Sequence, residues 1–221
     1  MAPCLHLATT MKASRAGTRG DTEERFLDAA ERLLIQVGYA SITTRTLAEE
    51  AGANHGLVHY YFGSMEELFL KVLERVTERL TQRQRAMYAT PTPFIEKWRE
   101  AMRYLDEDRP YQKVWWELQA MAWNHPEYQE RVLGVHGAWR AAMRDAVSEA
   151  AKRYRLDTGP FTADDWITLI VTMNTGVIHQ RLSGITHGHE DLLAAVERWL
   201  SGLEEGMKAA EERAGEQASQ G

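Results

Sequence analysis

The sequence predicts an all-α protein, in which a small N-terminal head of three short helices precedes a larger helical body, with about nine helices in all. Apolar residues recur almost throughout with the 3.6-residue period of helices, and no segment shows a convincing strand alternation. The first three helical segments are short and closely spaced, whereas the later ones are mostly long. We therefore divide the chain into a flexible basic arm (1–20), a head (21–67), a body (68–215) and a disordered tail (216–221).

The first two helices of the head have clear start and stop signals. We expect the first helix to begin at residue 21 or 22, because Asp21 and Glu24 have the spacing of a capping box. It should end at Gly38, since glycine readily adopts the left-handed conformation that closes a helix. Thr43 is expected to cap the second helix, which ends before Gly52.

A third helix follows after only a short turn, and a long fourth helix follows it directly. Asn54 is expected to cap the third helix, in which Val58 and Phe62 share the face that turns inward. Ser64 and Glu67 form a second capping box, which opens the fourth helix. The second and third helices, joined by a tight turn that contains glycine, therefore have the arrangement of a helix-turn-helix.

Prolines, glycines and capping residues divide the body into five further helices. Thr92 is expected to cap a helix that begins at Pro93, and Thr162 with Asp165 to cap a later one. The last helix should begin at about His189 and lose order near residue 215. The other breaks fall at residues 106–110, 124–126, 158–160 and 183–184.

The head resembles the DNA-binding unit of the tetracycline-repressor (TetR) family of bacterial regulators. The resemblance lies in FLDAAERLLIQVGYASITTRTLAEEAGANHGLVHYYFGSMEEL, about a fifth of the chain. Its alanine-rich first helix, Gly-Tyr, Thr-Thr, Leu-Ala-x-x-Ala-Gly and Ser-x-Glu-Glu-Leu occur in the family's order and spacing. The body carries no recognisable motif, but its size and helix count match the family's nine-helix layout. The resemblance implies a third helix that enters the major groove of DNA.

The resemblance also implies roles for individual residues of the head. Thr43 caps the second helix, Thr44 contacts phosphate, and Arg45 reads a guanine edge. His59 and Tyr61 contact phosphate or sugar. The residues that approach the bases are Asn54, His55, Gly56, Leu57 and Tyr60.

The head departs from the family and from a strongly basic DNA-binding surface. His59 stands where the family often has an aromatic residue, and Met65 where it often has a lysine that meets phosphate. Residues 1–70 carry six basic and nine acidic side chains, and the whole chain has a formal net charge of −6. We therefore expect DNA binding through a few positioned contacts, with a weak dependence on salt. The arm, with Lys12, Arg15 and Arg19, is either a solvated tail or an extension that reaches phosphate or a minor groove.

Tryptophan and methionine in the body predict a small-molecule site. Six of the seven tryptophans fall between residues 98 and 166. Aromatic cavities with few polar groups suit small ligands, although the same side chains also suit a plain core. An aromatic cage with Glu117 would bind a cation, and neutral hydrophobic ligands fit equally well. The candidate ligand residues are Trp115, Trp116, Glu117, Met121, His136, Trp139, Met143, Trp166, Met173 and Asn174.

A protein with one reading helix needs two copies to bind a palindromic site, so we expect a homodimer. The last two helices carry long apolar stripes that would form a four-helix bundle with a second copy. The alternative is that these stripes pack inside one subunit. The candidate interface residues are Trp166, Ile170, Val177, Leu193, Val196 and Leu200.

The remaining features predict no catalysis, metal or cofactor. The sequence has no glycine-rich phosphate loop, nucleophile elbow or metal triad, and His187 and His189 read as exposed loop residues without a third ligand. One cysteine, Cys4, and no apolar run of about 20 residues fit a cytoplasmic protein away from membranes. We expect a repressor that a small hydrophobic or aromatic effector releases from its operator. The alternative is a ligand-binding protein whose head no longer binds DNA.

Overall fold

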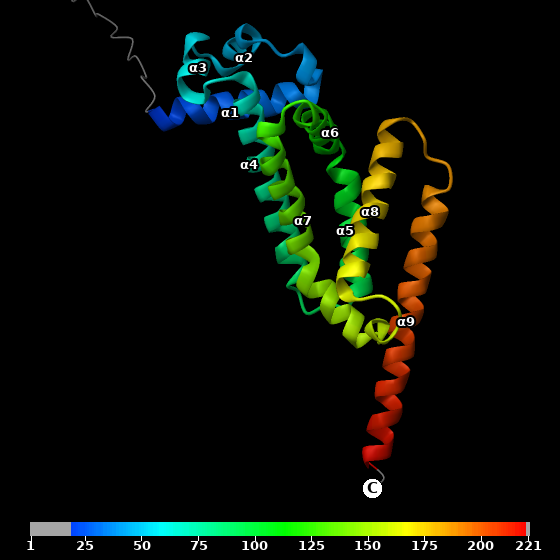
Figure 1. The fold of residues 1–221 in the computed structure, drawn as a ribbon. Helices are drawn as coiled ribbons and strands as arrows, with labels where there is room; N and C mark the ends of the chain where they lie inside the picture. Colours follow the sequence, from blue (N-terminus) through cyan, green and yellow to red (C-terminus); the bar gives the residue numbers. More distant parts are fainter. Residues whose placement is uncertain (1–18, 220–221) are drawn as a thin grey trace, which may run out of the picture.

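The computed structural model describes residues 19–219, which contain nine α-helices, two short 3-10 helices and no β-strand. This confirms the all-α prediction. Figure 1 shows the head at one end of the molecule, with α1 (Arg19–Val37) crossing beneath α2 (Thr44–Ala51) and α3 (Gly56–Phe62). From the head, α4 (Met65–Tyr88) runs down into the body.

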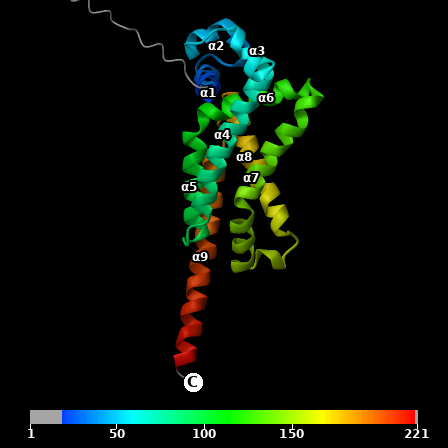
Figure 2. The same ribbon diagram turned by 90° about the vertical axis from the view of Figure 1, so that its left-hand side faces the viewer.

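The five remaining long helices build the body. They are α5 (Phe94–Glu107), α6 (Arg109–Trp123), α7 (Pro126–Arg153), α8 (Ala163–Leu182) and α9 (His189–Ser219). The two long helices α4 and α7 pack along each other, and α8 packs on α7. The last helix, α9, lies against α5 and projects beyond the rest of the body in both views (Figures 1 and 2).

The head and the body share one continuous apolar core. Phe26, Leu34 and Val58 are fully buried within the head, and Phe69 continues the cluster down α4. The same cluster includes Leu118 of α6. Because no polar layer separates the two parts, the head is packed directly on the helices of the body.

Several predicted caps are confirmed. The side chain of Thr43 accepts a hydrogen bond from the Thr46 N–H, and that of Ser64 accepts one from the Glu67 N–H at 3.1 Å. Thr162 and Asp165 form the predicted reciprocal capping box at the start of α8. These interactions depend on neighbouring residues alone, which explains why the sequence predicts them.

Other predicted boundaries are wrong by one to a few residues. The first helix already begins at Arg19, so Asp21 lies in its first turn, where a carboxylate favours the helix dipole. Pro93 is the N-cap of α5 rather than its first residue, and Thr92 bonds to Thr90 instead. The last helix continues to Ser219, beyond the expected end at about 215. Residues 1–18, with most of the predicted basic arm, lie outside the described part.

Candidate nucleic-acid interface and ligand cavity

A clamp from α1 holds the turn between α2 and α3. Gly52 ends α2 in the left-handed conformation, with φ +59°. The guanidinium of Arg25 donates to the carbonyl oxygens of Ala51 and Gly52, both at 2.5 Å. After the turn, the Asn54 Oδ1 atom accepts from the Gly56 N–H at 2.9 Å in an Asx turn. The N-cap of α3 is His55 rather than the predicted Asn54, and the His55 side chain makes no capping bond. Arg25 has no local sequence signal for this role, because its partners are carbonyl groups about 26 residues away.

The outer face of α3 is largely polar and open to solvent. Val58 and Phe62 anchor the helix in the core, as predicted. Tyr60 is 63% exposed, and His55 and His59 are exposed beside it. This gives a short helix one anchored face and one exposed face, the arrangement that a reading helix in a DNA groove requires.

Five further candidate DNA residues lie differently from one another. Leu57 and Tyr61 are only partly exposed and pack on the head core, so Leu57 is less open to a DNA base than Tyr60. Arg45 is 87% exposed and forms an ion pair with Glu49 at 3.0 Å. The Thr43 hydroxyl is occupied in capping α2, and Thr44 is half-buried in its first turn.

Basic side chains of α4 offset the acidic residues of α1. Arg75 pairs with Glu24, Asp28 and Glu31, and Arg79 also pairs with Glu31. Burial alone would raise the pKa of the Glu31 carboxyl, but its bonds to Arg79 and Arg75 hold that pKa below its ordinary value. The count of charged side chains over residues 1–70 does not include Arg75 and Arg79. Three acidic residues of α1 are therefore paired with arginines of α4.

A cavity of about 170 Å³ lies between α4, α5, α6, α7 and α8. We call it the central cavity. Its wall is mostly apolar, and it includes five of the predicted ligand residues: Trp115, His136, Trp139, Met143 and Asn174.

The central cavity carries a few polar groups. The Oε1 atom of Gln84 and the Oδ1 atom of Asn174 are buried without a hydrogen-bond partner among the described residues. Asp108 forms a 2.5 Å ion pair with Arg83. Burial lowers the pKa of His136 and raises that of Tyr88 to about 12, so both groups favour their neutral forms. The cavity therefore suits a small ligand that offers hydrogen bonds to otherwise unpaired amides.

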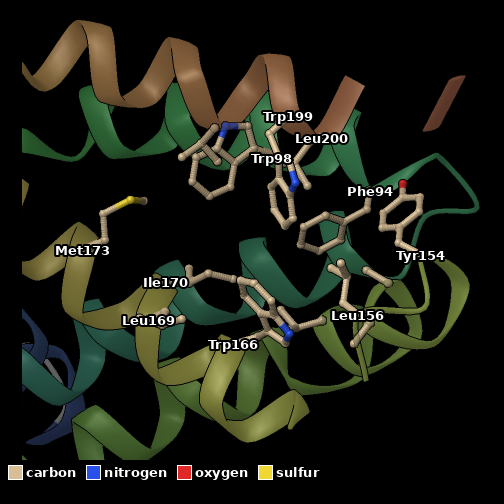
Figure 3. A pocket seen from close by; sticks show the side chains of 14 residues that line it. Phe94, Trp98, Tyr154, Leu156, Trp166, Leu169, Ile170, Met173, Trp199 and Leu200 are labelled. Carbon is tan, nitrogen blue, oxygen red and sulfur yellow. The ribbon is translucent and has the colours of Figure 1, made fainter. Parts of the chain in front are cut away.

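The other predicted ligand residues lie elsewhere. Trp116 packs on the ring of His179, with 4.8 Å between the ring centroids. Met121 packs in a small cluster with Leu70 near the head. Trp166 and Met173 line a second cavity, between α5, α7, α8 and α9, which is shown in Figure 3. The tryptophans that lie close together in the sequence therefore pack at several separate places in the body.

Glu117 connects the body to the head instead of lining a cavity. Its Oε2 atom accepts a hydrogen bond from the backbone N–H of Tyr39 at 2.6 Å. Its Oε1 atom would lie 2.9 Å from a Cβ atom added at Gly38, whose φ is +78°. Lys113 lies 3.6 Å from the same carboxylate. Two residues before Glu117, Trp115 lines the central cavity, so α6 contacts both the cavity and the loop between α1 and α2.

The predicted dimer residues of α8 and α9 lie mainly inside the subunit. Leu200 is 3% exposed and packs on Ile95 and Trp98, and Val177 is also buried. Ile170, Leu193 and Val196 pack partly against the same cluster, and Trp166 packs on another. Val177 and Leu200 therefore have little surface left for a partner, whereas the four partly buried residues of the set stay a prediction. The exposed apolar side chains near these helices are Phe161, Leu169, Leu182, Ile185, Leu192 and Trp199.

Of the two histidines near the last loop, His187 and His189, the second is part of the packed structure. His189, predicted to be exposed, is buried, and its Nε2 atom lies 2.6 Å from the Oε1 atom of Gln180. It thereby ties the start of α9 to the end of α8. Within residues 19–219, no group of three or more His, Cys, Asp or Glu side chains is placed to hold a metal ion. No helix in that range is long and apolar enough to cross a membrane.

Comparisons with known proteins agree with the geometry of the head. Residues 26–72 match the model of the bacterial regulatory proteins of the tetR family. The HTH-type transcriptional repressor NicS of Pseudomonas putida is 28% identical over 126 residues, which cover 53% of this chain and 51% of that protein. The HTH-type transcriptional regulator BetI of Brucella anthropi is 36% identical over 56 residues, 25% of this chain and 29% of that protein. The chain thus spans about half the length, or less, of the curated relatives it matches.

Solved structures share the fold over most of the chain. A putative transcriptional regulator from Saccharomonospora viridis, in complex with choline, aligns with a TM-score of 0.66 at 20% identity, over 85% of this chain and 97% of that one. A putative transcriptional regulator from Rhodococcus sp. RHA1 aligns with a TM-score of 0.66 at 19% identity, over 81% and 95% of the two chains. Identities this low show the fold alone. Residues 26–72 thus match the tetR family of bacterial regulatory proteins, and the described residues share the fold of these solved regulators.

Proposed function

We propose that this protein is a ligand-responsive DNA-binding transcriptional regulator, and that it acts as a repressor. The observation that carries the proposal is α3, which is anchored by Val58 and Phe62 and presents Tyr60 and its exposed neighbours outward. It lies within the segment that matches the tetR family. A helix of this kind fits the major groove, which is wide enough for one helix.

DNA contacts are proposed for the exposed residues at the start of α2 and along α3. Arg45 would read a base edge after leaving Glu49, and leaving an exposed ion pair costs only about 0–1 kcal/mol. Tyr60, His55 and Gly56 would approach the bases, and His59 the backbone. Arg25 supports this surface indirectly, because it fixes the turn that sets the angle between α2 and α3.

The functional unit is proposed to be a homodimer, since two copies of α3 can then read successive grooves about 34–36 Å apart. The exposed apolar side chains of α8 and α9 support a partner on this side of the body. They include Leu169, Leu192 and Trp199. Burying such side chains against a second copy removes apolar surface from water, which favours association.

The effector is proposed to bind in the central cavity. Its aromatic walls suit an apolar or aromatic body, and the unpaired amides of Gln84 and Asn174 suit a ligand with hydrogen-bonding groups. The regulator from Saccharomonospora viridis is described in complex with choline, which supports a small-molecule ligand for a body of this fold.

Two helices would carry the effector's influence to the head. The cavity residues Leu73 and Val76 belong to α4, which is capped at Ser64 directly after α3. The cavity residue Trp115 belongs to α6, which holds the α1–α2 loop through Glu117. An effector that binds one arrangement of these helices better than the other shifts the spacing of the two α3 helices.

A gel-shift assay with DNA from upstream of the protein's own gene, and with a selected oligonucleotide pool, tests the proposal. Tyr60→Ala and Arg45→Ala should each weaken specific binding by about 1–3 kcal/mol if they touch bases. Arg109→Ala is the matched control, because Arg109 is an exposed arginine of the body, paired with Asp106. If neither DNA sample binds at low salt, the alternative stands: a ligand-binding protein whose head no longer binds DNA.

A further inference from the structure

We propose that the cavity between α5, α7, α8 and α9 is a second small-molecule site, which takes a neutral and largely apolar ligand. We call it the α8–α9 cavity. Its volume is about 360 Å³, which is within the usual range for ligand pockets. It is separate from the central cavity, with which it shares no lining residue. The proposal does not depend on DNA binding.

The wall of the α8–α9 cavity consists of aromatic and aliphatic side chains. Figure 3 shows Trp199 and Leu200 of α9 facing Trp166 and Ile170 of α8 across the pocket. The rings of Trp166 and Trp199 are stacked at one point, with 5.7 Å between their centroids. Phe94, Trp98 and Tyr154 add further rings. Flat aromatic surfaces on several sides favour a planar or compact apolar guest.

The wall offers very little to a polar guest. The phenol of Tyr154 already donates to Glu204 Oε2 at 2.7 Å. The Nε1 atom of Trp166 is buried and has no hydrogen-bond partner among the described residues. A water molecule needs two to four polar partners to occupy a cavity stably, and apolar cavities of about 150 Å³ stay dry and bind molecules such as benzene. The cavity therefore selects an apolar ligand.

Ion pairs and buried side chains hold the cavity open from both sides. On the α9 side, Arg99 pairs with Glu197 at 2.7 Å, and Leu200 is buried on Ile95. On the α8 side, Ile167 is fully buried against α7 residues. The helices α8 and α9 contact each other at the Trp166–Trp199 stack, and each is also fixed to a different neighbour, which keeps the cavity beside that stack. A pocket formed before binding avoids the cost of ordering its walls.

A small molecule fits this space better than a side chain of a second copy. The rim residues Leu169 and Trp199 are 47% and 43% exposed, so a partner covering α8 and α9 would contact them first. The floor, Ala150 and Ala151 of α7, is buried below this rim. A partner helix laid across the rim would cover the cavity without filling its floor. A charged ligand is disfavoured as well, because the lining has no charged side chain to offset its loss of hydration.

Binding of the neutral fluorescent probe N-phenyl-1-naphthylamine to the purified full chain tests the proposal. The probe's fluorescence should rise on binding while tryptophan emission falls. Ala150→Leu fills the floor of the α8–α9 cavity and Val196→Phe narrows its α9 wall, and each should weaken probe binding at least 10-fold. Ala101→Leu is the matched control, because Ala101 lines the central cavity and is equally buried. Thermal unfolding and circular dichroism identify any variant that has not folded.

Three results would overturn the proposal. The first is the absence of probe binding. The second is binding that Ala101→Leu abolishes and the other two variants leave unchanged, since this would place the probe in the central cavity. The third is binding that weakens as rising protein concentration forms dimers, since the partner subunit would then fill the site. Loss of DNA binding with probe binding intact would count against the proposed function alone.

Discussion

Removing the Glu117 carboxylate should loosen the head from the body. The Tyr39 N–H donates to Glu117 Oε2 at 2.6 Å across 78 residues of chain. Hydrogen bonds to charged groups contribute about 1.5–3 kcal/mol, and an unpaired buried donor has a comparable cost. We therefore expect Glu117→Ala to lower the free energy of unfolding by about 1.5–3 kcal/mol. Urea unfolding at pH 7, followed by circular dichroism, measures this change.

Gly38 allows a test that isolates this contact. With φ +78° and ψ 163°, it occupies a region that is essentially restricted to glycine and costs other residues about 1–3 kcal/mol. An added Cβ atom would also lie 2.9 Å from Glu117 Oε1. Gly38→Ala should therefore destabilise the protein in the presence of Glu117 more than it does in the Glu117→Ala background. The double-mutant cycle should give an interaction energy of about 0.5–3 kcal/mol.

Lys113→Ala is the matched control for the charge. Lys113 lies 3.6 Å from the Glu117 carboxylate and is about half exposed, so its loss should change stability by less than about 1 kcal/mol. In the gel-shift assay, Glu117→Ala should also reduce the difference in DNA affinity between the free and effector-bound protein, because α6 no longer holds the α1–α2 loop. A loss of stability below 0.5 kcal/mol, or strict additivity with Gly38→Ala, would refute this reasoning.

Three further predictions concern the head. Ser64→Ala removes the acceptor for the Glu67 N–H and should cost about 0.5–2 kcal/mol in urea unfolding, whereas Ser64→Asp should keep most of that stability. Arg25→Ala leaves two carbonyl oxygens of the turn without their donor and should lower the free energy of unfolding by more than about 1 kcal/mol. Arg32→Ala is the control, because it breaks an exposed ion pair with Glu50. If the control lowers stability by as much, Arg25 has no special role in holding the turn. The lowered pKa of Glu31 means that the unfolded chain takes up a proton at higher pH than the folded one. The contribution of Glu31 to the free energy of unfolding is therefore complete above the unfolded-state pKa near 4.5. It is lost as the pH falls through the lower pKa of the folded state. Glu31→Gln should flatten the loss of stability below pH 4.5, and an unchanged acid limb would contradict the assignment.

Local signals in the sequence predicted the head well. Thr43 and Ser64 cap helices through atoms three residues away, so the capping pattern contains all the information needed. Val58 and Phe62 turned inward as their helical spacing indicated. The errors occurred where a partner lies far along the chain. Arg75 neutralises acids of α1 from α4, 44 to 51 residues away, and no count over the head alone includes it.

The candidate sites of the body were predicted only in part, for a related reason. Composition identified the aromatic residues but not which of them share a cavity. Trp115 and Glu117 lie two residues apart, yet about 200° of helical rotation separates their side chains. One of them lines the central cavity and the other holds the head. Which face of α6 meets which neighbour depends on tertiary packing, so a list of nearby residues could not resolve it.

The same geometry gives α8 a place between the two cavities. Met173 lines the α8–α9 cavity and the next residue, Asn174, lines the central cavity. Ile170 and Val171 divide in the same way. In the sequence, the long apolar stripe on α8 indicates a dimer surface. The same stripe also fits a helix that forms a wall of two cavities, because its apolar residues lie on two adjacent faces. A ligand in either cavity therefore contacts α8, and the exposed Leu169 on that helix belongs to the proposed dimer surface. The two proposed sites would thus act on one element, and occupancy of one should change affinity at the other through linkage.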